Sequence, residues 1–333
     1  MKTTSVLIQS LCAPCFCRCR YCLLSWDGHV VGADWERSVN LAERFIKELT
    51  EQAPEIKTGF SFGYSMEHPD LKKALKTLRR LGSPTADFLQ CDGMKMRDGK
   101  ECASLMETLV SEGVKELNFT VYGKEEYHDR FAGRKGDYVL ILRMMKAAKN
   151  AGLYFTAGVP LTGGNIEQID DVVSVLKDAG CGKIRLFIPH EEGRGKSLSK
   201  IRLKQSELQL ISPENRALLN GNIYKTEGDW LKEREPVRGE ERTIILSLCS
   251  DNIDEYEKRG ALSVVHEIER LDEEYYAAFP DFKELANTYG EKNGDKMYRI
   301  RDLYHHYRMK YAEEHGVSVY DVTDERQSGS RRN

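Results

Sequence analysis

The first 200 residues alternate between short apolar runs and longer amphipathic segments. The short runs are rich in β-branched and aromatic residues, which favours strands, whereas the longer segments carry apolar residues at helical spacing. Strands that alternate with helices in this way form parallel sheets joined by crossover helices. Strands are predicted near residues 5–9, 57–62, 87–90, 116–121, 154–159 and 183–188, with helices such as 35–49 and 138–151 between them. Six such units over residues 1–200 predict an α/β fold, a parallel (βα)6 partial TIM barrel.

After Gly195 the composition becomes more charged and more typical of helices. Pro213, Pro236 and Gly239 interrupt residues 201–240, which predicts a helix and a linker there. One strand is predicted at 242–248, and helical periodicity returns at 254–271, 275–289 and 298–315. We therefore expect a mostly helical extension at 241–326 that covers one barrel opening and shapes the substrate cavity, followed by a disordered tail at 327–333.

Charge and hydropathy narrow the possible partners. The chain has 333 residues, with 50 Lys and Arg against 53 Asp and Glu and a net charge of −3, so neither nucleic acid nor a membrane surface is expected as a partner. No run of about eighteen apolar residues occurs, and the N-terminal residues lack the apolar stretch of a signal peptide. We expect a cytoplasmic protein, because that compartment keeps thiols reduced.

Candidate chemistry is concentrated in a cluster of cysteines directly after the first predicted strand. Five of the nine cysteines lie between Cys12 and Cys22. Within this cluster only Cys15, Cys19 and Cys22 have the spacing C-x-x-x-C-x-x-C. Three thiolates so close together can bind three irons of a cubane iron–sulfur cluster and leave the fourth iron open.

Two other interpretations of the cysteine cluster have to be weighed. Cys12-x-x-Cys15 and Cys19-x-x-Cys22 also form a pair of C-x-x-C units, as in zinc sites. Zinc ribbons, however, separate such units by a dozen or more residues, whereas only three residues intervene here. A disulfide framework is disfavoured because a chain of this length can bury an ample core without cross-links.

At these cysteines, and in the barrel that carries them, the sequence resembles the radical S-adenosylmethionine (radical SAM) enzymes over about residues 1–200. The resemblance implies a [4Fe-4S] cluster on Cys15, Cys19 and Cys22, with the amino and carboxylate groups of SAM on the open iron. It also implies reductive cleavage of SAM to a 5'-deoxyadenosyl radical, which abstracts a hydrogen atom from the substrate, and an oxygen-sensitive protein. Barrel enzymes carry their chemistry at the C-terminal ends of the strands, where the cysteine loop is expected.

The same resemblance implies cofactor-binding residues in the first half of the chain. Tyr21 takes the place of an aromatic residue beside the adenine, with loop packing as the alternative. Gly63, Tyr64 and Ser65 take the place of the family's Gly-Gly-Glu-Pro turn. Tyr64 replaces the glutamate and Ser65 the proline, so we expect a backbone contact at Gly63 rather than a carboxylate contact.

Further cofactor positions are implied along the later strands. Thr120 is similar to a family residue near the ribose or carboxylate of SAM, although it could equally be a side chain that fills the barrel. Val159 and Phe187 resemble residues that line the adenine and the barrel exit. Gly93 is expected to have a positive φ after the third strand, and His128 to be a hydrogen-bonded structural group.

The sequence therefore predicts a radical SAM enzyme. We expect the substrate to be a peptide or a small metabolite, and the reducing partner to be an electron donor such as flavodoxin or ferredoxin. The only cysteine of the C-terminal region, Cys249, is either a buried thiol or a hydrogen-atom donor to a substrate radical. The alternative function is a metal- or cluster-binding sensor or interaction protein without catalysis, which the altered turn at 62–65 favours.

Overall fold

All six predicted strands are present in the computed structural model, which describes residues 2–10, 15–22, 33–62, 65–83, 86–190, 193–233, 241–250, 252–291 and 294–317. The strands are β1 (Lys2–Ser10), β2 (Lys57–Phe62), β3 (Phe88–Gln90), β4 (Glu116–Thr120), β5 (Tyr154–Pro160), β6 (Lys183–Phe187), β7 (Lys225–Thr226), β8 (Glu241–Leu248) and β9 (Met297–Tyr298). Differences from the predicted limits of the first six are confined to their ends.

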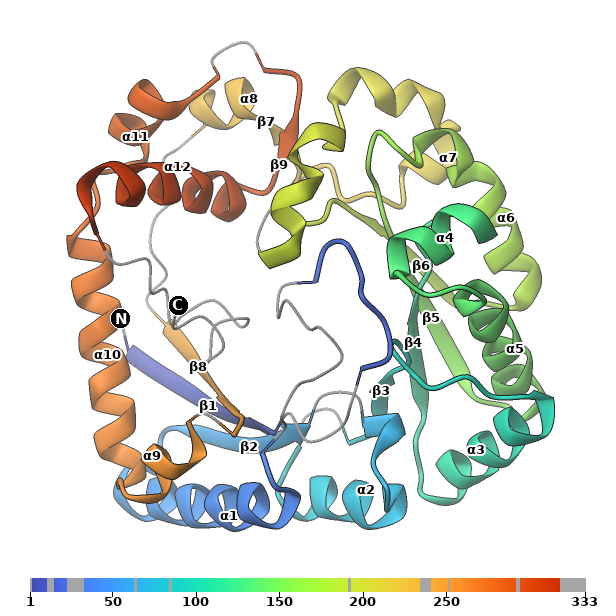
Figure 1. Cartoon of the computed structure of the whole chain (residues 1–333). Helices are drawn as coiled ribbons and strands as arrows, with labels where there is room; N and C mark the ends of the chain where they lie inside the picture. Colours follow the sequence, from blue (N-terminus) through green and yellow to red (C-terminus); the bar gives the residue numbers. More distant parts are fainter. Residues whose placement is uncertain are drawn as a thin grey trace.

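The large strands form two parallel sheets. One has the order β2-β1-β8 and the other the order β3-β4-β5-β6, while β7 and β9 form a small antiparallel pair. In Figure 1 the two parallel sheets line an arc, with the helices on its outside. The predicted α/β fold, a partial parallel barrel, is confirmed.

The last large strand extends the barrel on a side that the sequence pattern did not indicate. β8 pairs in parallel with β1, for example Leu7 with Ile245 and Ser10 with Leu248. The chain thus returns from its C-terminal region to lie beside its first strand. Because the strands are parallel, the residues that follow β8 leave the sheet at the same edge as the cysteine loop that follows β1.

Helices surround the sheets. The α-helices are α1 (Trp35–Gln52), α2 (Leu71–Arg80), α3 (Gly99–Ser111), α4 (Glu125–Ala132), α5 (Asp137–Asn150), α6 (Ile169–Ala179), α7 (Pro213–Arg216), α8 (Glu227–Lys232), α9 (Ile253–Glu257), α10 (Ala261–Ala277), α11 (Phe282–Tyr289) and α12 (Ile300–His315). The 3-10 helices are η1 (Ser65–Glu67), η2 (Ile166–Gln168), η3 (Gly193–Ile201) and η4 (Gln205–Leu210). None of the described helices combines the length and apolar character needed to cross a lipid bilayer.

Helix α1 shows how the sequence builds the outer layer. Asp34 caps its first turn by accepting the N–H of Arg37 at 2.9 Å. Val39, Phe45 and Leu49 recur at helical spacing and are buried in the main core with strand residues such as Val6, Ile8 and Phe60. Burial of each such side chain contributes roughly 1.5–3 kcal/mol, which fixes the helix against the outer face of β1 and β2.

The helices of the C-terminal region end at breakers. The periodic segment 254–271 is divided into α9 and α10, because Gly260 has an extended backbone (φ −76°, ψ 148°) and forms the N-cap of α10. Pro280 separates α10 from α11, whose first turn is capped by Asp281. In Figure 1, α8, α11 and α12 occupy the part of the ring between α10 and α7.

Candidate cluster and cofactor site

The cysteine loop is held by backbone hydrogen bonds to two neighbouring parts of the barrel. The N–H of Phe16 donates to the carbonyl of Gly93 at 2.8 Å, just after β3. The N–H groups of Arg18 and Arg20 donate to the carbonyls of Ala132 and Phe131, at 2.7 and 2.9 Å, at the end of α4. The loop therefore lies at the C-terminal end of β3, and Figure 1 shows it as the blue trace beside β3 and β4.

Gly93 makes room for the first cysteine of the triple. Its φ is +66°, as the sequence predicted, and a Cβ atom at this position would lie 2.3 Å from the Sγ atom of Cys15. A side chain at residue 93 would therefore displace the thiol.

The three thiols of the predicted ligand triple are free, and those of Cys19 and Cys22 act electrostatically on that of Cys15. Cys15 is buried, and Cys19 and Cys22 are half-buried. Burial raises the pKa of the Cys15 thiol to about 12, and the neighbouring thiols of Cys19 and Cys22 add to this rise. Mutual repulsion of this kind is relieved when thiolates bind cationic iron, so the donor set suits an iron–sulfur cluster.

The remaining cysteines of the group are Cys12 and Cys17. Cys12 lies outside the described residues. Cys17 is buried, and its Sγ atom lies 3.7 Å from Oδ1 of Asp137 at the start of α5. Asp137 also pairs with Arg134, so Cys17 belongs to a buried polar network next to the loop.

His128 completes this network. It is fully buried, and its Nδ1 atom accepts the N–H of Tyr122 at 3.1 Å. This bond assigns the proton to Nε2, which donates to Asp137 at 3.0 Å. Although burial opposes it, hydrogen bonding from His128 and the charge of Arg134 lower the pKa of Asp137. Both ring nitrogens are occupied, which is the structural role expected for His128.

An aromatic cluster adjoins the cysteine loop. The ring of Tyr21 lies 5.7 Å from that of Tyr122, 5.8 Å from that of Phe131 and 6.3 Å from that of Phe187, measured between centroids. The hydroxyl of Tyr122 donates to Sγ of Cys19 at 3.1 Å. Tyr21 and Phe187, both predicted to bind the cofactor, are thus brought together next to a predicted iron ligand.

The family of this chain follows from its match to a family profile. The profile of the Radical SAM superfamily matches residues 13–179, which is half of the chain. The chain belongs to the radical SAM superfamily. No curated protein sequence matches this radical SAM protein.

Solved structures resemble it at low identity. The structure of SuiB from Streptococcus suis bound to S-adenosylmethionine is 12% identical, covers 73% of this chain and 58% of its own, and has a TM-score of 0.48. The structure of anSMEcpe with bound AdoMet is 17% identical, with coverages of 62% and 58% and a TM-score of 0.43. Coproporphyrinogen III oxidase (HemN) from Escherichia coli is 13% identical, with coverages of 74% and 63% and a TM-score of 0.40. This radical SAM protein thus spans less than two thirds of the length of each of these chains.

Other predicted cofactor residues have different surroundings. Thr120 is buried, and its hydroxyl and N–H both donate to the carboxylate of Asp92, at 2.7 and 2.9 Å. The side chain of Val159 is fully buried in the main core, so a cofactor contact at this position would have to involve its backbone. Gly63 and Tyr64 lie outside the described residues, and of Ser65 only the backbone, in η1, is described.

Arg194 is a candidate site residue to which the sequence assigned no individual role. Its N–H donates to the carbonyl of Cys22 at 3.0 Å, so the loop after β6 is attached to the end of the cysteine loop. Its Nε and Nη2 atoms are buried and have no hydrogen-bond partner among the described residues. A buried guanidinium with unused donors suits a carboxylate, the group that SAM carries.

A buried ion cluster joins the same loop to the C-terminal helix. Nδ1 of His190 lies 2.5 Å from Oδ1 of Asp302 on α12, and Nε of Arg299 lies 3.0 Å from Oδ2. Burial alone would raise the pKa of Asp302, but hydrogen bonding to His190 and the charges of His190 and Arg299 hold it well below its usual range. The carbonyl of His190 would lie 2.3 Å from a Cβ atom on Gly195, next to Tyr21.

Among the described residues, no group of three or more His, Cys, Asp or Glu side chains could hold a single metal ion. A cubane cluster requires a different arrangement, because each thiolate binds a different iron.

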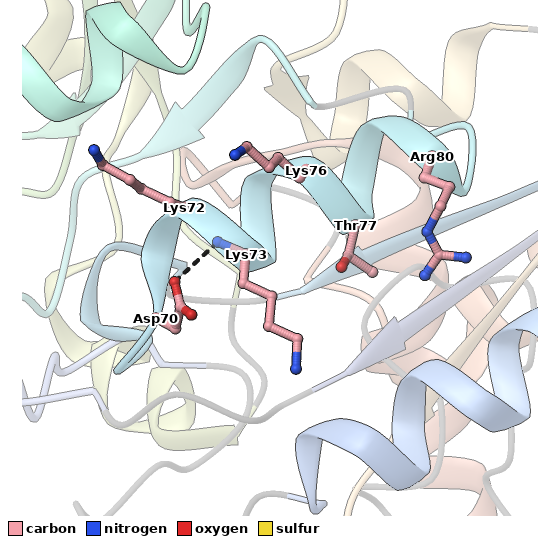
Figure 2. Close-up of a pocket in the computed structure, with 6 residues that line it drawn as sticks. All are labelled: Asp70, Lys72, Lys73, Lys76, Thr77 and Arg80. Carbon is pink, nitrogen blue, oxygen red and sulfur yellow. Dashed lines mark hydrogen bonds between the residues drawn. The ribbon is translucent and has the colours of Figure 1, made fainter.

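A hollow of about 410 Å³ lies along α2 on the outside of the barrel; Figure 2 shows its lining residues Asp70, Lys72, Lys73, Lys76, Thr77 and Arg80.

Proposed function

We propose that this protein is a radical SAM enzyme that holds a [4Fe-4S] cluster with Cys15, Cys19 and Cys22 and uses it to cleave SAM. The observation that carries the proposal is that the loop of the three free thiols is bonded to the C-terminal end of β3, where Cys15 needs Gly93 to be without a side chain. When bound, the reduced cluster supplies the electron that breaks the carbon–sulfur bond of SAM.

In this proposal, residues around the loop bind different parts of SAM or modulate the cluster. Tyr21 and Phe187 offer an apolar surface for the adenine, and Arg194 offers its unused donors to the carboxylate. Tyr122 donates to the sulfur of Cys19, which favours the reduced, more negative state of a ligated iron. The buried aromatic rings also exclude water from this side of the loop.

Polar side chains on the inner face of the barrel favour a polar substrate. Leu117, Phe119 and Leu186 are buried on the outer side of their strands, so the alternate residues face the barrel interior. There the amide of Asn118 donates to the hydroxyl of Thr156 at 2.8 Å. On the opposite sheet, Ser5 and Thr243 share a 2.8 Å hydrogen bond and Ser247 donates to Gln9 at 3.2 Å. Amides and hydroxyls on this wall can hydrogen-bond a peptide backbone or a polar metabolite, and the apolar pair Leu7 and Ile245 lies between those of β1 and β8.

Cys249 remains the candidate hydrogen-atom donor. It follows β8 directly, and Leu248 pairs with Ser10 of β1, so Cys249 lies at the same edge of the barrel as the cysteine loop. Its N–H donates to Asn252 at 3.0 Å, which fixes the turn, and its side chain is half-buried. A partly accessible thiol at this edge can approach a substrate bound in the barrel.

The test is an alanine series at the four described cysteines of the loop. After anaerobic reconstitution with iron and sulfide, the Cys15→Ala, Cys19→Ala and Cys22→Ala variants should lose iron and form no 5'-deoxyadenosine with dithionite. Cys17→Ala is the matched control and should keep both properties. Equal loss of iron in all four would refute the ligand assignment. Iron binding by the wild type without cleavage of SAM would refute the enzyme and support a sensor.

A further inference from the structure

Side chains on the inner face of the barrel stay accessible to solvent on both parallel sheets. In a closed (βα)8 barrel, bulky branched side chains fill this space. Here Leu7 and Gln9 of β1 and Asn118 of β4 are only half-buried, and Thr243 of β8 is exposed. The described side chains therefore leave the inner face of this partial barrel open to a ligand.

Arg185 lies on this inner face, in the middle of β6. Leu186 is buried in the main core on the outer side of the strand, so its neighbours Arg185 and Phe187 point into the barrel. The ring of Phe187 lies 6.3 Å from that of Tyr21 at the cysteine loop, which agrees with this direction. Arg185 is thus about 7 Å further along β6, towards its N-terminal end, than the aromatic cluster.

The guanidinium of Arg185 has no counter-ion in the part of the chain that the structure describes. Its side chain is exposed, and no hydrogen bond or ion pair joins it to another described residue. At the same level of the sheet, Gly158 pairs with both Arg185 and Thr120 and places no side chain between them. The carboxylate of Asp92 at this level is occupied by the hydroxyl and N–H of Thr120. An arginine presents five N–H donors, so this one has donors to offer to a ligand.

The wall around Arg185 is short of negative charge. Lys183 precedes it on the same face, and it is also exposed and forms no ion pair with another described residue. Asn118 and Thr156 of the adjoining strands are joined by their own 2.8 Å hydrogen bond. Glu116 accepts from Thr156 at 3.2 Å and lies about 13 Å nearer to the N-terminal ends of the strands than the level of Arg185. A ligand that binds here has to bring the negative charge itself.

We propose that Arg185 binds an anionic group of the substrate, a carboxylate or a phosphate, inside the barrel. The inference rests on the proposed function, because it takes the ligand of the barrel to be the substrate of a radical SAM enzyme. The planar guanidinium donates two parallel N–H bonds to a carboxylate or phosphate, which fixes the orientation of the ligand as well as its position. An anchor at this depth holds the rest of the substrate towards the cysteine loop and so selects which of its hydrogen atoms lies nearest to the cofactor.

A second arginine separates this anion from the carboxylate of SAM. The backbone of Arg194 is bonded to the carbonyl of Cys22 at 3.0 Å, at the end of the cysteine loop. Arg185 instead lies on the strand, on the far side of Phe187 from that loop. The two guanidinium groups therefore serve two different anions, one on the cofactor and one on the substrate.

The first experiment measures whether anions protect Arg185 in the full chain, with neither cluster nor SAM added. Phenylglyoxal modifies accessible guanidinium groups, and the rate of modification of Arg185 is followed by mass spectrometry of its peptide. The probes are inorganic phosphate, glutarate and a glutamate residue capped at both ends, with glutaramide as the neutral control. Arg18 is exposed and forms no ion pair with another described residue, so it serves as the internal control.

An anionic probe at ten times its dissociation constant should slow the modification of Arg185 about tenfold and leave that of Arg18 unchanged. Glutaramide should protect neither residue. The probe that protects at the lowest concentration identifies the source of the anion: a phosphate ester, a small dicarboxylate or an acidic side chain of a peptide. The proposal is overturned if Arg185 does not react, if no anion protects it, or if glutaramide protects it equally.

Variants test the same assignment by calorimetry with the protecting probe. Arg185→Gln should weaken its binding about tenfold or more, because a charge-assisted hydrogen-bond pair is lost. Arg185→Lys keeps the charge and should restore part of the affinity, and Arg18→Gln should bind as the wild type does. The melting temperature of Arg185→Gln should not change, because the side chain bonds to no other described residue. Equal binding by Arg185→Gln and the wild type would overturn the proposal.

A last comparison separates substrate from cofactor in the reconstituted protein. SAM should bind Arg185→Gln as tightly as the wild type, and SAM alone should not protect Arg185 from phenylglyoxal. Weaker binding of SAM by the variant, or protection by SAM alone, would place Arg185 in the cofactor site and overturn the proposal. A wild type whose Arg185 is protected by anions but which cleaves no SAM would leave the anion site intact and refute the proposed function instead.

Discussion

Replacement of Gly93 by alanine tests whether the close approach between the β3 turn and the cysteine loop controls cluster binding. The structure indicates two separate effects. The positive φ of +66° costs an L-residue about 1–2 kcal/mol of folding free energy. In addition, the new Cβ atom would stand 2.3 Å from Sγ of Cys15, well inside van der Waals contact.

The second effect is the larger one for function. Non-bonded atoms of this size approach to about 3.5–4 Å, so the Cys15 thiol has to move by on the order of 1 Å. Metal–ligand distances tolerate only about 0.2 Å. We therefore expect Gly93→Ala to bind much less iron and sulfide after anaerobic reconstitution, and to have a correspondingly weak visible absorption, while it remains folded by circular dichroism.

Gly152→Ala separates the two effects. Gly152 has a φ of +73°, and a Cβ atom there would meet nothing within 4 Å. This variant should show a similar loss of about 1–2 kcal/mol in unfolding free energy but a full complement of iron. If Gly93→Ala binds as much iron as the wild type, or if Gly152→Ala loses as much iron as Gly93→Ala, the reasoning is wrong.

Three more predictions follow from buried polar contacts. Asp302→Asn should lower the free energy of unfolding at pH 7 by about 1–3 kcal/mol, because the carboxylate accepts charge-assisted hydrogen bonds. Since the pKa of Asp302 is depressed in the fold, its contribution is present above the usual carboxyl pKa, and the difference from wild type should shrink as the pH falls below about 4; a difference independent of pH would count against the ion pair. Asp272→Ala removes the buried carboxylate 2.5 Å from the guanidinium of Arg242 and leaves it the partly exposed Glu269 and Glu273, so it should cost about 1–3 kcal/mol in chemical denaturation, whereas no measurable cost would show that the pair is dispensable. Tyr122→Phe removes the O–H donated to Cys19 and should lower the reduction potential of the reconstituted cluster by on the order of tens of millivolts, read by potentiometric titration; an unchanged potential would exclude this hydrogen bond from the bound state.

Local sequence patterns were sufficient for the elements of the barrel and for the position of the cysteine loop. Strands such as 57–62 and helices such as α1 are encoded by residues that lie close together in the chain, through residue composition, helical periodicity and capping. The C-x-x-x-C-x-x-C motif is also a local pattern, because it lies within eight consecutive residues. The positive φ at Gly93 was also predictable, because a strand-to-loop turn with glycine is a local signal.

Contacts between distant segments required the tertiary structure. The pairing of β8 with β1 joins residues more than 230 positions apart, and the residues of a strand do not specify which strand lies next to it in the sheet. For the same reason the ion pair between His190 and Asp302, 112 positions apart, was not visible in the sequence. The contact of Cys17 with Asp137 likewise arises only when separate loops converge at the ends of parallel strands. The sequence alone indicated which residues are candidate cluster ligands, because ligand spacing is local; the fold decided what surrounds the cysteine loop, because burial and charge there are set by segments that meet only in three dimensions.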